Sequence, residues 1–170
     1  MTIWLVGMMG AGKSAVGARL AARLALPFHD TDAEIEREAE ASVAELFARE
    51  GEAGFRAREQ KAIEGLLGRD AVVALGGGAL TVPGTRERLE AHGRVVYLRA
   101  RPETLVARVG EGGERPLLRG LDAEGRGARL RELLARREPD YARAALVVDV
   151  DGADLERVVA RVADRLAGPA

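Results

Sequence analysis

Short runs of consecutive apolar residues alternate along this chain with longer segments in which apolar residues recur every three or four positions. Four runs have the length and continuity of strands: Ile3–Val6, Val72–Leu75, Val95–Leu98 and Leu146–Val150. The second and third suit strands that are buried on both faces. The first run is followed by Lys13–Ala25, where helical spacing gives one apolar stripe. Alternation of strands and helices predicts an α/β fold, with a parallel sheet and helices on both of its faces.

Five further segments are predicted to be helical: 33–50, 54–68, 84–92, 128–138 and 153–166. A polar turn at His29–Asp32 precedes the first of them, and Gly51 and Gly54 separate the first from the second. Pro102 marks one more helix N-terminus. Residues 110–127, rich in glycine, glutamate and arginine, predict a long mobile loop. We expect one three-layer domain over residues 1–170, built on a sheet of about five strands.

The loop after the first strand reads GMMGAGKS over residues 7–14. It matches the phosphate-binding pattern Gly-x4-Gly-Lys-Ser, whose glycines let backbone N–H groups face a phosphate. The helix that follows adds partial positive charge at its N-terminus. Lys13 supplies a cation for the phosphates, and Ser14 supplies a hydroxyl for Mg²⁺. The sequence therefore predicts a nucleotide site formed by Gly10, Ala11, Gly12, Lys13, Ser14 and Ala15.

Composition narrows the class of protein that carries this loop. Apolar residues make up 47% of the chain and charged residues 31%, as in a globular domain. The net charge of −1 gives no general attraction to nucleic acid or to an acidic membrane. The chain has no cysteine, which fits a reducing compartment, and no apolar run approaches the ~18 residues that span a bilayer. We expect a cytoplasmic protein that binds neither nucleic acid nor membrane.

Other motifs in the chain indicate whether the protein is a GTPase, a transport ATPase or a kinase. A GTPase would carry an Asn-Lys-x-Asp motif for guanine, and this chain has no asparagine. Asp122–Gly125 has the letters of a switch motif, but no strand precedes it. The signature of a transport ATPase is also missing. These observations favour a small-molecule kinase, which needs an acceptor site beside the γ-phosphate of the nucleotide.

Two aspartates are candidates for that acceptor site. Asp30 and Asp32 stand two positions apart, so their carboxylates can point the same way at the C-terminal end of a strand. A carboxylate there could orient or deprotonate an acceptor hydroxyl and could bind water on Mg²⁺. The alternative is that Asp32 caps the helix predicted from residue 33. Beside a phosphate-binding loop, the functional interpretation is favoured.

An arginine–glutamate pair and a run of glycines are further candidates. Arg56 and Glu59 lie three positions apart on one helix face, where Glu59 can hold the guanidinium in place. The alternative is a solvated surface pair. Gly76–Gly78 directly follow a predicted strand, so the backbone there can approach a ligand. The alternative for this run is a flexible turn.

Taken together, these stretches resemble the shikimate kinase family, within the P-loop enzymes that are similar to nucleoside-monophosphate kinases. The matching stretches follow in the family's order over nearly the whole chain: GMMGAGKS, DTDAEIE, GEAGFRAREQ, the strand with GGG at 72–78, RPLL and RREPDY. The resemblance implies a P-loop kinase fold with a mobile lid at residues 110–124. It also implies an acceptor-binding helical segment at residues 32–60.

The resemblance assigns roles on the nucleotide side. Arg115 would reach the phosphates together with Lys13, and Arg108 would stack on adenine. Asp32 would contact the acceptor hydroxyl. The expected catalytic residues are thus Lys13, Asp32 and Arg115, and the expected ligands of Mg²⁺ are Ser14, Asp30 and Asp32.

On the acceptor side, the resemblance implies a carboxylate clamp. Arg56 and Arg137 would hold the carboxylate of shikimate, a task that suits the bidentate geometry of guanidinium groups. Arg136 stands next to Arg137, and the sequence leaves open which of the two takes this role. The expected acceptor contacts are Asp32, Arg56, Glu59, Gly77, Gly78 and Arg137.

The resemblance therefore implies an enzyme that transfers the γ-phosphoryl group of ATP to shikimate, with Mg²⁺ as cofactor, giving shikimate 3-phosphate and ADP. Such an enzyme belongs to the biosynthesis of chorismate and the aromatic amino acids, and we expect a monomer. Two alternatives stay open at this point. One is a P-loop kinase for another small metabolite, such as gluconate, and the other is a nucleotide-binding protein without catalytic activity.

Overall fold

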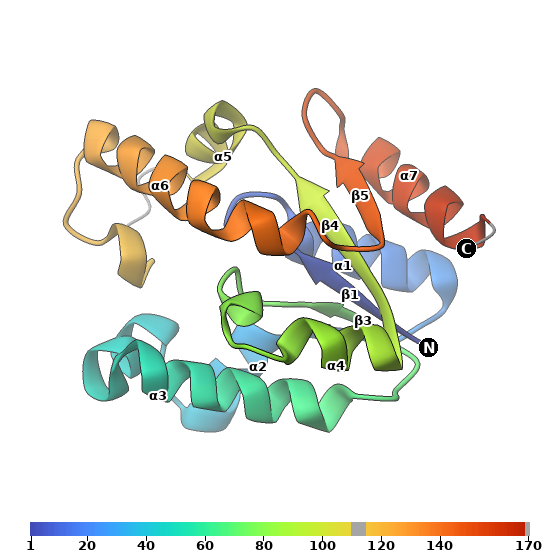
Figure 1. Cartoon of the computed structure of the whole chain (residues 1–170), viewed down its shortest axis with the longest axis horizontal. Helices are drawn as coiled ribbons and strands as arrows, with labels where there is room; N and C mark the ends of the chain where they lie inside the picture. The colour runs from blue at the N-terminus through green and yellow to red at the C-terminus, as the bar shows by residue number, and fades with distance from the viewer. Residues whose placement is uncertain (110–114, 169–170) are drawn as a thin grey trace.

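Five parallel strands form the sheet of this protein, seen here in a computed structural model that describes residues 1–109 and 115–168 (Figure 1). The strands are β1 (Thr2–Val6), β2 (Phe28–Asp30), β3 (Val72–Ala74), β4 (Gly93–Arg99) and β5 (Leu146–Asp149). Their order across the sheet is β2-β3-β1-β4-β5, and each neighbouring pair is parallel. The predicted α/β fold class is confirmed.

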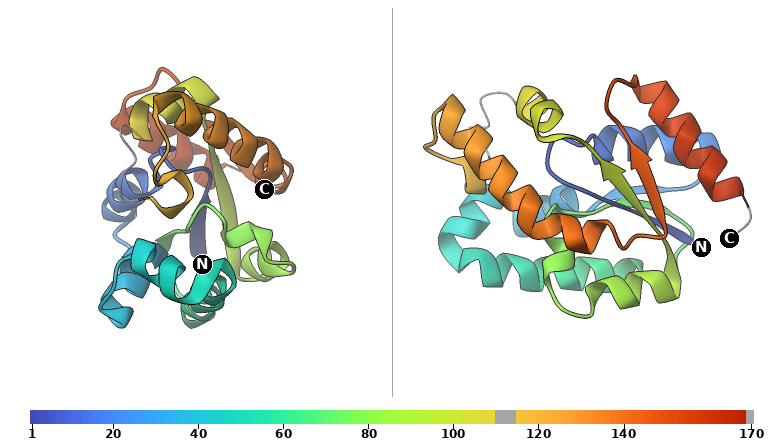
Figure 2. Two further views of the ribbon diagram at one scale, coloured as in Figure 1. Left: turned by 90° about the vertical axis from the view of Figure 1, so that its left-hand side faces the viewer. Right: turned by 45° about the horizontal axis from the view of Figure 1, so that its top comes forward.

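Helices cover the sheet on both sides. They are α1 (Lys13–Leu24), α2 (Thr31–Ala39), α3 (Val43–Leu66), α4 (Thr85–His92), α5 (Pro102–Val109), α6 (Ala123–Tyr141) and α7 (Leu155–Ala167), with short 3₁₀ turns η1 (Ala79–Thr81) and η2 (Pro116–Leu118). Helix α6 crosses the face of the sheet nearer the viewer in Figure 1, and α1 packs with α7 behind it. Figure 2 shows the same layers from two other sides.

The residues after α1 differ from the prediction. Phe28–Asp30, expected to lie partly in a polar turn, form the edge strand β2, which pairs with β3. Helix α2 then begins at Thr31, and its N-cap is Asp30 rather than Asp32. The side chain of Asp30 accepts hydrogen bonds from the backbone N–H groups of Asp32 and Ala33, at 3.1 and 3.3 Å. Helix-capping propensity alone could not decide which of the two aspartates is the N-cap. Pairing of β2 with β3 determines where the chain leaves the sheet and therefore where α2 begins.

The helical segment predicted over 33–50 is two helices. The chain turns at Glu40, which has a left-handed φ of 49°, and α3 starts from a capping box formed by Ser42 and Glu45. The predicted break at Gly51 is a kink inside α3, with φ 70° and ψ 179°, while Gly54 lies within the helix. The two helices pack against each other around a small apolar cluster of their own.

The predicted loop over 110–127 is partly helical. Residues 110–114 of the expected lid lie outside the described part of the chain. Residues 116–118 form η2, whose Leu118 is 1% exposed in the main core, and α6 already begins at Ala123.

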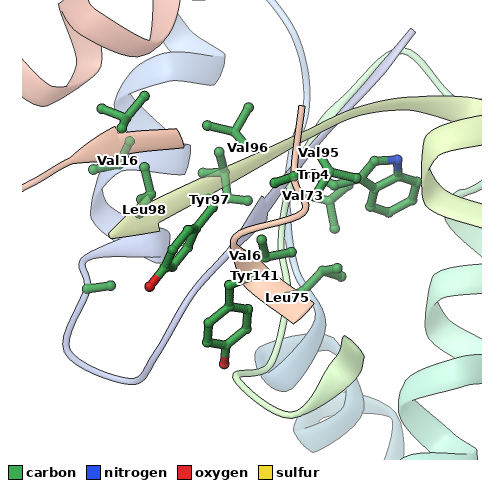
Figure 3. Packing of buried hydrophobic residues seen from close by; sticks show 14 of the residues in the cluster. Trp4, Val6, Val16, Val73, Leu75, Val95, Val96, Tyr97, Leu98 and Tyr141 are labelled. Carbon is green, nitrogen blue, oxygen red and sulfur yellow. The ribbon is translucent and has the colours of Figure 1, made fainter. Parts of the chain in front are cut away.

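Burial of the central strands explains their continuous apolar runs. Trp4, Val95 and Leu98 are fully buried, and Figure 3 shows Trp4 and Val95 beside Val73 of β3, with Leu98 near Val16 of α1. Since all strands are parallel, their carboxyl ends meet at one edge of the sheet. The chain order reverses at β1, which lies between β3 and β4. This edge is where the candidate functional residues gather.

Candidate active site

The loop between β1 and α1 has the backbone of a phosphate-binding loop. Gly10 and Gly12 have φ values of 84° and 92°, which side chains with a Cβ rarely adopt. A Cβ at Gly10 would also lie 3.0 Å from the side chain of Val109 and 3.2 Å from the carbonyl oxygen of Leu105. The loop therefore requires glycine at both positions. Ala11 is buried, whereas Ser14 and Ala15 are exposed at the start of α1.

Lys13 lies folded over this loop. Its Nζ donates hydrogen bonds to the carbonyl oxygens of Gly7 and Met8, at 2.8 and 3.1 Å. Burial lowers the pKa of Lys13 to about 8; nearby Asp32 opposes that shift and nearby Arg115 adds to it. The charges of Asp32 and Arg115 both reach the Lys13 ammonium group because the fold brings residues that are far apart in the sequence to this loop.

One of the two predicted carboxylates contacts Ser14, and the other, close by in the chain, has a buried oxygen atom. The Ser14 hydroxyl donates to Oδ2 of Asp30 at 2.5 Å. Oδ1 of Asp32 is buried and has no hydrogen-bond partner among the described residues. Burial, then the charge of Asp30, raises the pKa of Asp32. A hydroxyl and two carboxylates are hard oxygen donors of the kind that Mg²⁺ prefers, and the buried oxygen without a partner suits such a cation or its water.

Arg56 and Glu59 are a buried pair, not a solvated one. Glu59 is fully buried and Arg56 is 9% exposed, and Nη1 of Arg56 donates to Oε2 of Glu59 at 2.6 Å. The guanidinium also lies over the rings of Phe55 and Phe47, at 5.4 and 6.0 Å from their centroids. The arginine is thus fixed on three sides.

Arg137 and Arg136 differ in environment. Arg137 is 5% exposed, and its Nη1 lies 3.8 Å from Sδ of Met8 in the phosphate-binding loop. The Arg136 side chain is 69% exposed and lies 3.6 Å from Glu132 on the outer face of α6. Of the two neighbours, only Arg137 reaches the site, because α6 turns one of them toward the sheet and the other toward solvent.

The glycines after β3 let side chains approach the backbone. A Cβ at Gly78 would collide with the guanidinium of Arg56, and a Cβ at Gly76 would collide with the carboxyl group of Glu59. At Gly77, a Cβ would lie 3.3 Å from Nη1 of Arg137. The glycine run is therefore needed because side chains approach its backbone closely, and it is not simply a flexible turn. Gly76, to which the family resemblance assigned no acceptor contact, lies against the carboxyl groups of Glu59 and Asp32.

One cavity of about 1030 Å³ brings together part of this set, whereas Lys13 and the expected acceptor contact Glu59 are not part of its lining. Its walls come from six parts of the chain, including the phosphate-binding loop, α2 and α3, the glycine run, the segment around η2, and α6. Sequence reasoning predicted the lining residues Asp32, Arg56, Gly77, Gly78, Arg115 and Arg137. It did not predict Met9, Glu36, Glu40, Phe47 and Arg119, which carry no local signal of a site.

Arg108 and Arg115 lie on different sides of the loop. Arg115 is exposed at the start of η2 and lines the cavity. Nη2 of Arg108 donates to the carbonyl oxygen of Val150 at 3.4 Å, and its Nη1 comes within 4.0 Å of the Cβ position of Gly12. Arg108 is thus next to the phosphate-binding loop but outside the cavity. The loop therefore has the cavity on one side and Arg108 on another.

A phosphate-binding loop at the edge of a parallel sheet, next to a cavity with two buried arginines and a buried carboxylate, defines a P-loop kinase of the small-molecule class. No helix in the described ranges is long and apolar enough to cross a membrane. The family model described as shikimate kinase matches residues 9–167.

Relatives and solved structures agree with that match. Shikimate kinase of Halorhodospira halophila is 48% identical over 98% of this chain and 93% of its own length. Shikimate kinase of Symbiobacterium thermophilum is 48% identical over 98% of this chain and 96% of its own length. The solved structure of shikimate kinase from Acinetobacter baumannii in complex with shikimate has a TM-score of 0.91 and 38% identity, and covers 97% of this chain and 92% of that one. The chain belongs to the shikimate kinase family.

Proposed function

We propose that this protein transfers the γ-phosphoryl group of ATP to a hydroxyl group of shikimate, giving shikimate 3-phosphate and ADP. The observation that carries the proposal is the pair of buried arginines, Arg56 and Arg137, in a cavity that opens beside the phosphate-binding loop. Arg56 is paired with Glu59 and, at 3.4 Å, with Glu52, while Arg137 forms no ion pair with the described residues. A second, unneutralised guanidinium suits an acceptor that brings its own carboxylate. The shikimate bound in the Acinetobacter baumannii relative supports the same acceptor.

On the donor side, the loop N–H groups and the N-terminus of α1 face the phosphates, and Lys13 supplies a compact positive charge. In the proposed complex, Nζ of Lys13 leaves the carbonyl oxygens of Gly7 and Met8 for the β- and γ-phosphates. Arg115 lines the cavity and adds charge where the transition state becomes more negative. Arg108 lies on the far side of the loop, where the adenine would be.

For Mg²⁺, the donor set of Ser14, Asp30 and Asp32 fits, since Ser14 contacts Asp30 and Asp32 adds a buried oxygen atom that has no partner among the described residues. When bound, the cation neutralises charge on the β- and γ-phosphate oxygens. The chain itself holds the donors in place, because Asp30 is fixed by the N-terminus of α2.

On the acceptor side, Asp32 accepts the proton of the reacting hydroxyl. The hydroxyl oxygen forms a bond to the γ-phosphorus, the bond from that phosphorus to the β–γ bridging oxygen breaks, and the electron pair leaves with ADP. The raised pKa of Asp32, caused by burial, suits a group that must take up a proton. Arg56 and Arg137 hold the acceptor carboxylate, so that catalysis consists mainly of positioning and charge stabilisation.

The proposal takes the chain as one monomeric kinase domain. Residues 32–60 supply the acceptor half of the site, and the lid proposed at residues 110–124 acts at the phosphates through its described part, which excludes 110–114. The wall formed by α2 and α3 supports the first assignment, and Arg115 in the cavity lining supports the second.

The test is ADP release measured with ATP and Mg²⁺ across four acceptors: shikimate, gluconate, AMP and CMP. We expect turnover with shikimate to exceed turnover with each of the others by a factor of at least about 100, because only shikimate matches both the clamp and the cavity. Turnover with gluconate alone would identify another metabolite kinase. ATP binding without turnover of any acceptor would show a nucleotide-binding protein without catalytic activity.

A further inference from the structure

A buried side chain of α6 reaches the phosphate-binding loop. The hydroxyl group of Tyr141, which is 2% exposed, donates a hydrogen bond to the carbonyl oxygen of Gly77 and lies 3.8 Å from Sδ of Met8. Met8 is itself 1% exposed and belongs to the loop between β1 and α1. Burial raises the pKa of Tyr141 to about 12, so its hydroxyl stays protonated and available as a donor.

The same sulfur atom touches the acceptor clamp. Nη1 of Arg137 lies 3.8 Å from Sδ of Met8, and Arg137 stands one helical turn before Tyr141 on α6. Gly77 closes the group, since a Cβ there would lie 3.3 Å from Arg137 and 3.5 Å from the carbonyl oxygen of Gly7. Met8, Gly77, Arg137 and Tyr141 thus form one packed contact group.

Tyr141 is held from behind. Its ring stacks on Tyr97 with centroids 5.1 Å apart at an angle of 30°, and Figure 3 shows the two rings side by side. The hydroxyl group of Tyr97 donates to Glu138 and does not take part in the contacts with Met8 or Gly77. The two tyrosines therefore share one packing environment, but only one of them joins α6 to the loop.

The other side of Met8 carries Lys13. Nζ of Lys13 donates hydrogen bonds to the carbonyl oxygens of Gly7 and Met8. These two carbonyl groups belong to the peptide groups immediately before and after the Cα atom of Met8. A nucleotide that draws Lys13 to its phosphates removes both hydrogen bonds. Occupancy of the loop thus acts on the backbone of the residue whose side chain contacts Arg137.

We propose that Tyr141 is a positioning residue whose hydroxyl group, through Met8 and Gly77, links nucleotide binding at the loop to the position of Arg137 in the acceptor clamp. The inference rests on the proposed function. In this proposal the contact group has two arrangements, one with Lys13 on the loop carbonyl oxygens and one with Lys13 on phosphate. Binding of the nucleotide and binding of shikimate are therefore coupled in free energy. Coupling of this kind is reciprocal, so each ligand must change the affinity for the other by the same factor.

The test compares Tyr141→Phe with Tyr97→Phe. Each variant removes one buried hydroxyl group and keeps the stacked rings. Calorimetry gives the Kd of shikimate with and without Mg²⁺-ADP, and the Kd of ADP with and without shikimate. We expect ADP to lower the shikimate Kd of the wild-type protein by at least about fivefold. In Tyr141→Phe that factor falls below about twofold, while in Tyr97→Phe it stays at the wild-type value.

Met8→Leu is a second variant in case Tyr141→Phe unfolds, which thermal melting would reveal. It keeps the volume, removes the sulfur contact and is expected to reduce the factor in the same direction. A wild-type factor near one, or equal factors in the two tyrosine variants, would overturn the inference even if the wild-type protein phosphorylates shikimate. A wild-type protein that neither binds nor phosphorylates shikimate would overturn the proposed function and the inference with it.

Discussion

Nη1 of Arg56 donates to Oε2 of Glu59 at 2.6 Å, and the glutamate that receives this hydrogen bond has no exposed surface. The arginine faces the cavity while the carboxylate lies behind it, so Glu59 determines where the positive charge points. On the same helix, Arg58 and Glu50 form a pair of similar length, 2.8 Å, that is partly exposed. The two pairs offer a matched comparison between a buried contact and a surface one.

Glu59→Gln is expected to raise the shikimate KM about tenfold or more, with the ATP KM changed less than about twofold. The reason is that above pH 7, where Glu59 is ionised, its carboxylate forms an ion pair with the Arg56 guanidinium, whereas the neutral amide of glutamine can only accept a hydrogen bond from it. Steady-state kinetics of Glu59→Gln and of the control Glu50→Gln measure this. An equal effect on both KM values, or an effect as large in Glu50→Gln, would contradict the role given to Glu59.

Glu59 also predicts how stability depends on pH. Burial raises the pKa of Glu59 from 4.5 to about 7 in the folded protein, so between these values the folded state keeps a proton that the unfolded state releases. The unfolding free energy of the ligand-free protein therefore falls as pH rises through this window, by about 3 kcal/mol from this group. Urea unfolding at pH 5 and pH 8 should show a smaller fall in Glu59→Gln than in the wild type. Glu50→Gln should keep the wild-type fall, and equal falls in all three proteins would refute the prediction.

Arg137→Ala is expected to raise the shikimate KM at least about thirtyfold, since it removes a buried guanidinium from the acceptor carboxylate. The ATP KM should change far less. Arg136→Ala is the control, because that side chain is 69% exposed on the outer face of the same helix. The assignment of the clamp fails if the two variants behave alike.

Asp32→Asn is expected to lower kcat about a hundredfold or more while the protein stays folded, since the amide cannot accept the hydroxyl proton. The variant keeps the shape of the side chain, whose Oδ1 is buried at the cavity. Single-turnover measurements separate the chemical step from product release. An unchanged rate of that step would remove the proposed role of Asp32 as proton acceptor.

Gly78→Ala is expected to raise the shikimate KM at least about tenfold, because a Cβ at this position displaces the guanidinium of Arg56. Gly65→Ala is the matched control on α3. A Cβ at Gly65 meets nothing within 4 Å, so kinetics should not change and helix propensity should raise the Tm slightly. Normal acceptor kinetics in Gly78→Ala would mean that Arg56 can move without loss.

The sequence by itself determined the parts of this protein that depend on local pattern. Buried strands must be apolar throughout, so the runs in β1, β3, β4 and β5 predicted the sheet. The loop at residues 7–14 needs particular residue types at fixed spacing, so its letters predicted a phosphate site. The family resemblance followed from the order of such stretches, and the comparisons confirmed it.

Only the tertiary structure decided which side chains meet. Arg136 and Arg137 are the same residue type at adjacent positions, and the rotation of α6 against the sheet buries one and exposes the other. Met8 and Tyr141 lie 133 residues apart, and no local pattern pairs them. The physical reason is that strand pairing and helix packing fix where each element begins and which way it faces. Propensity and spacing are short-range properties, whereas the acceptor clamp and its link to the phosphate-binding loop exist only once the sheet has formed.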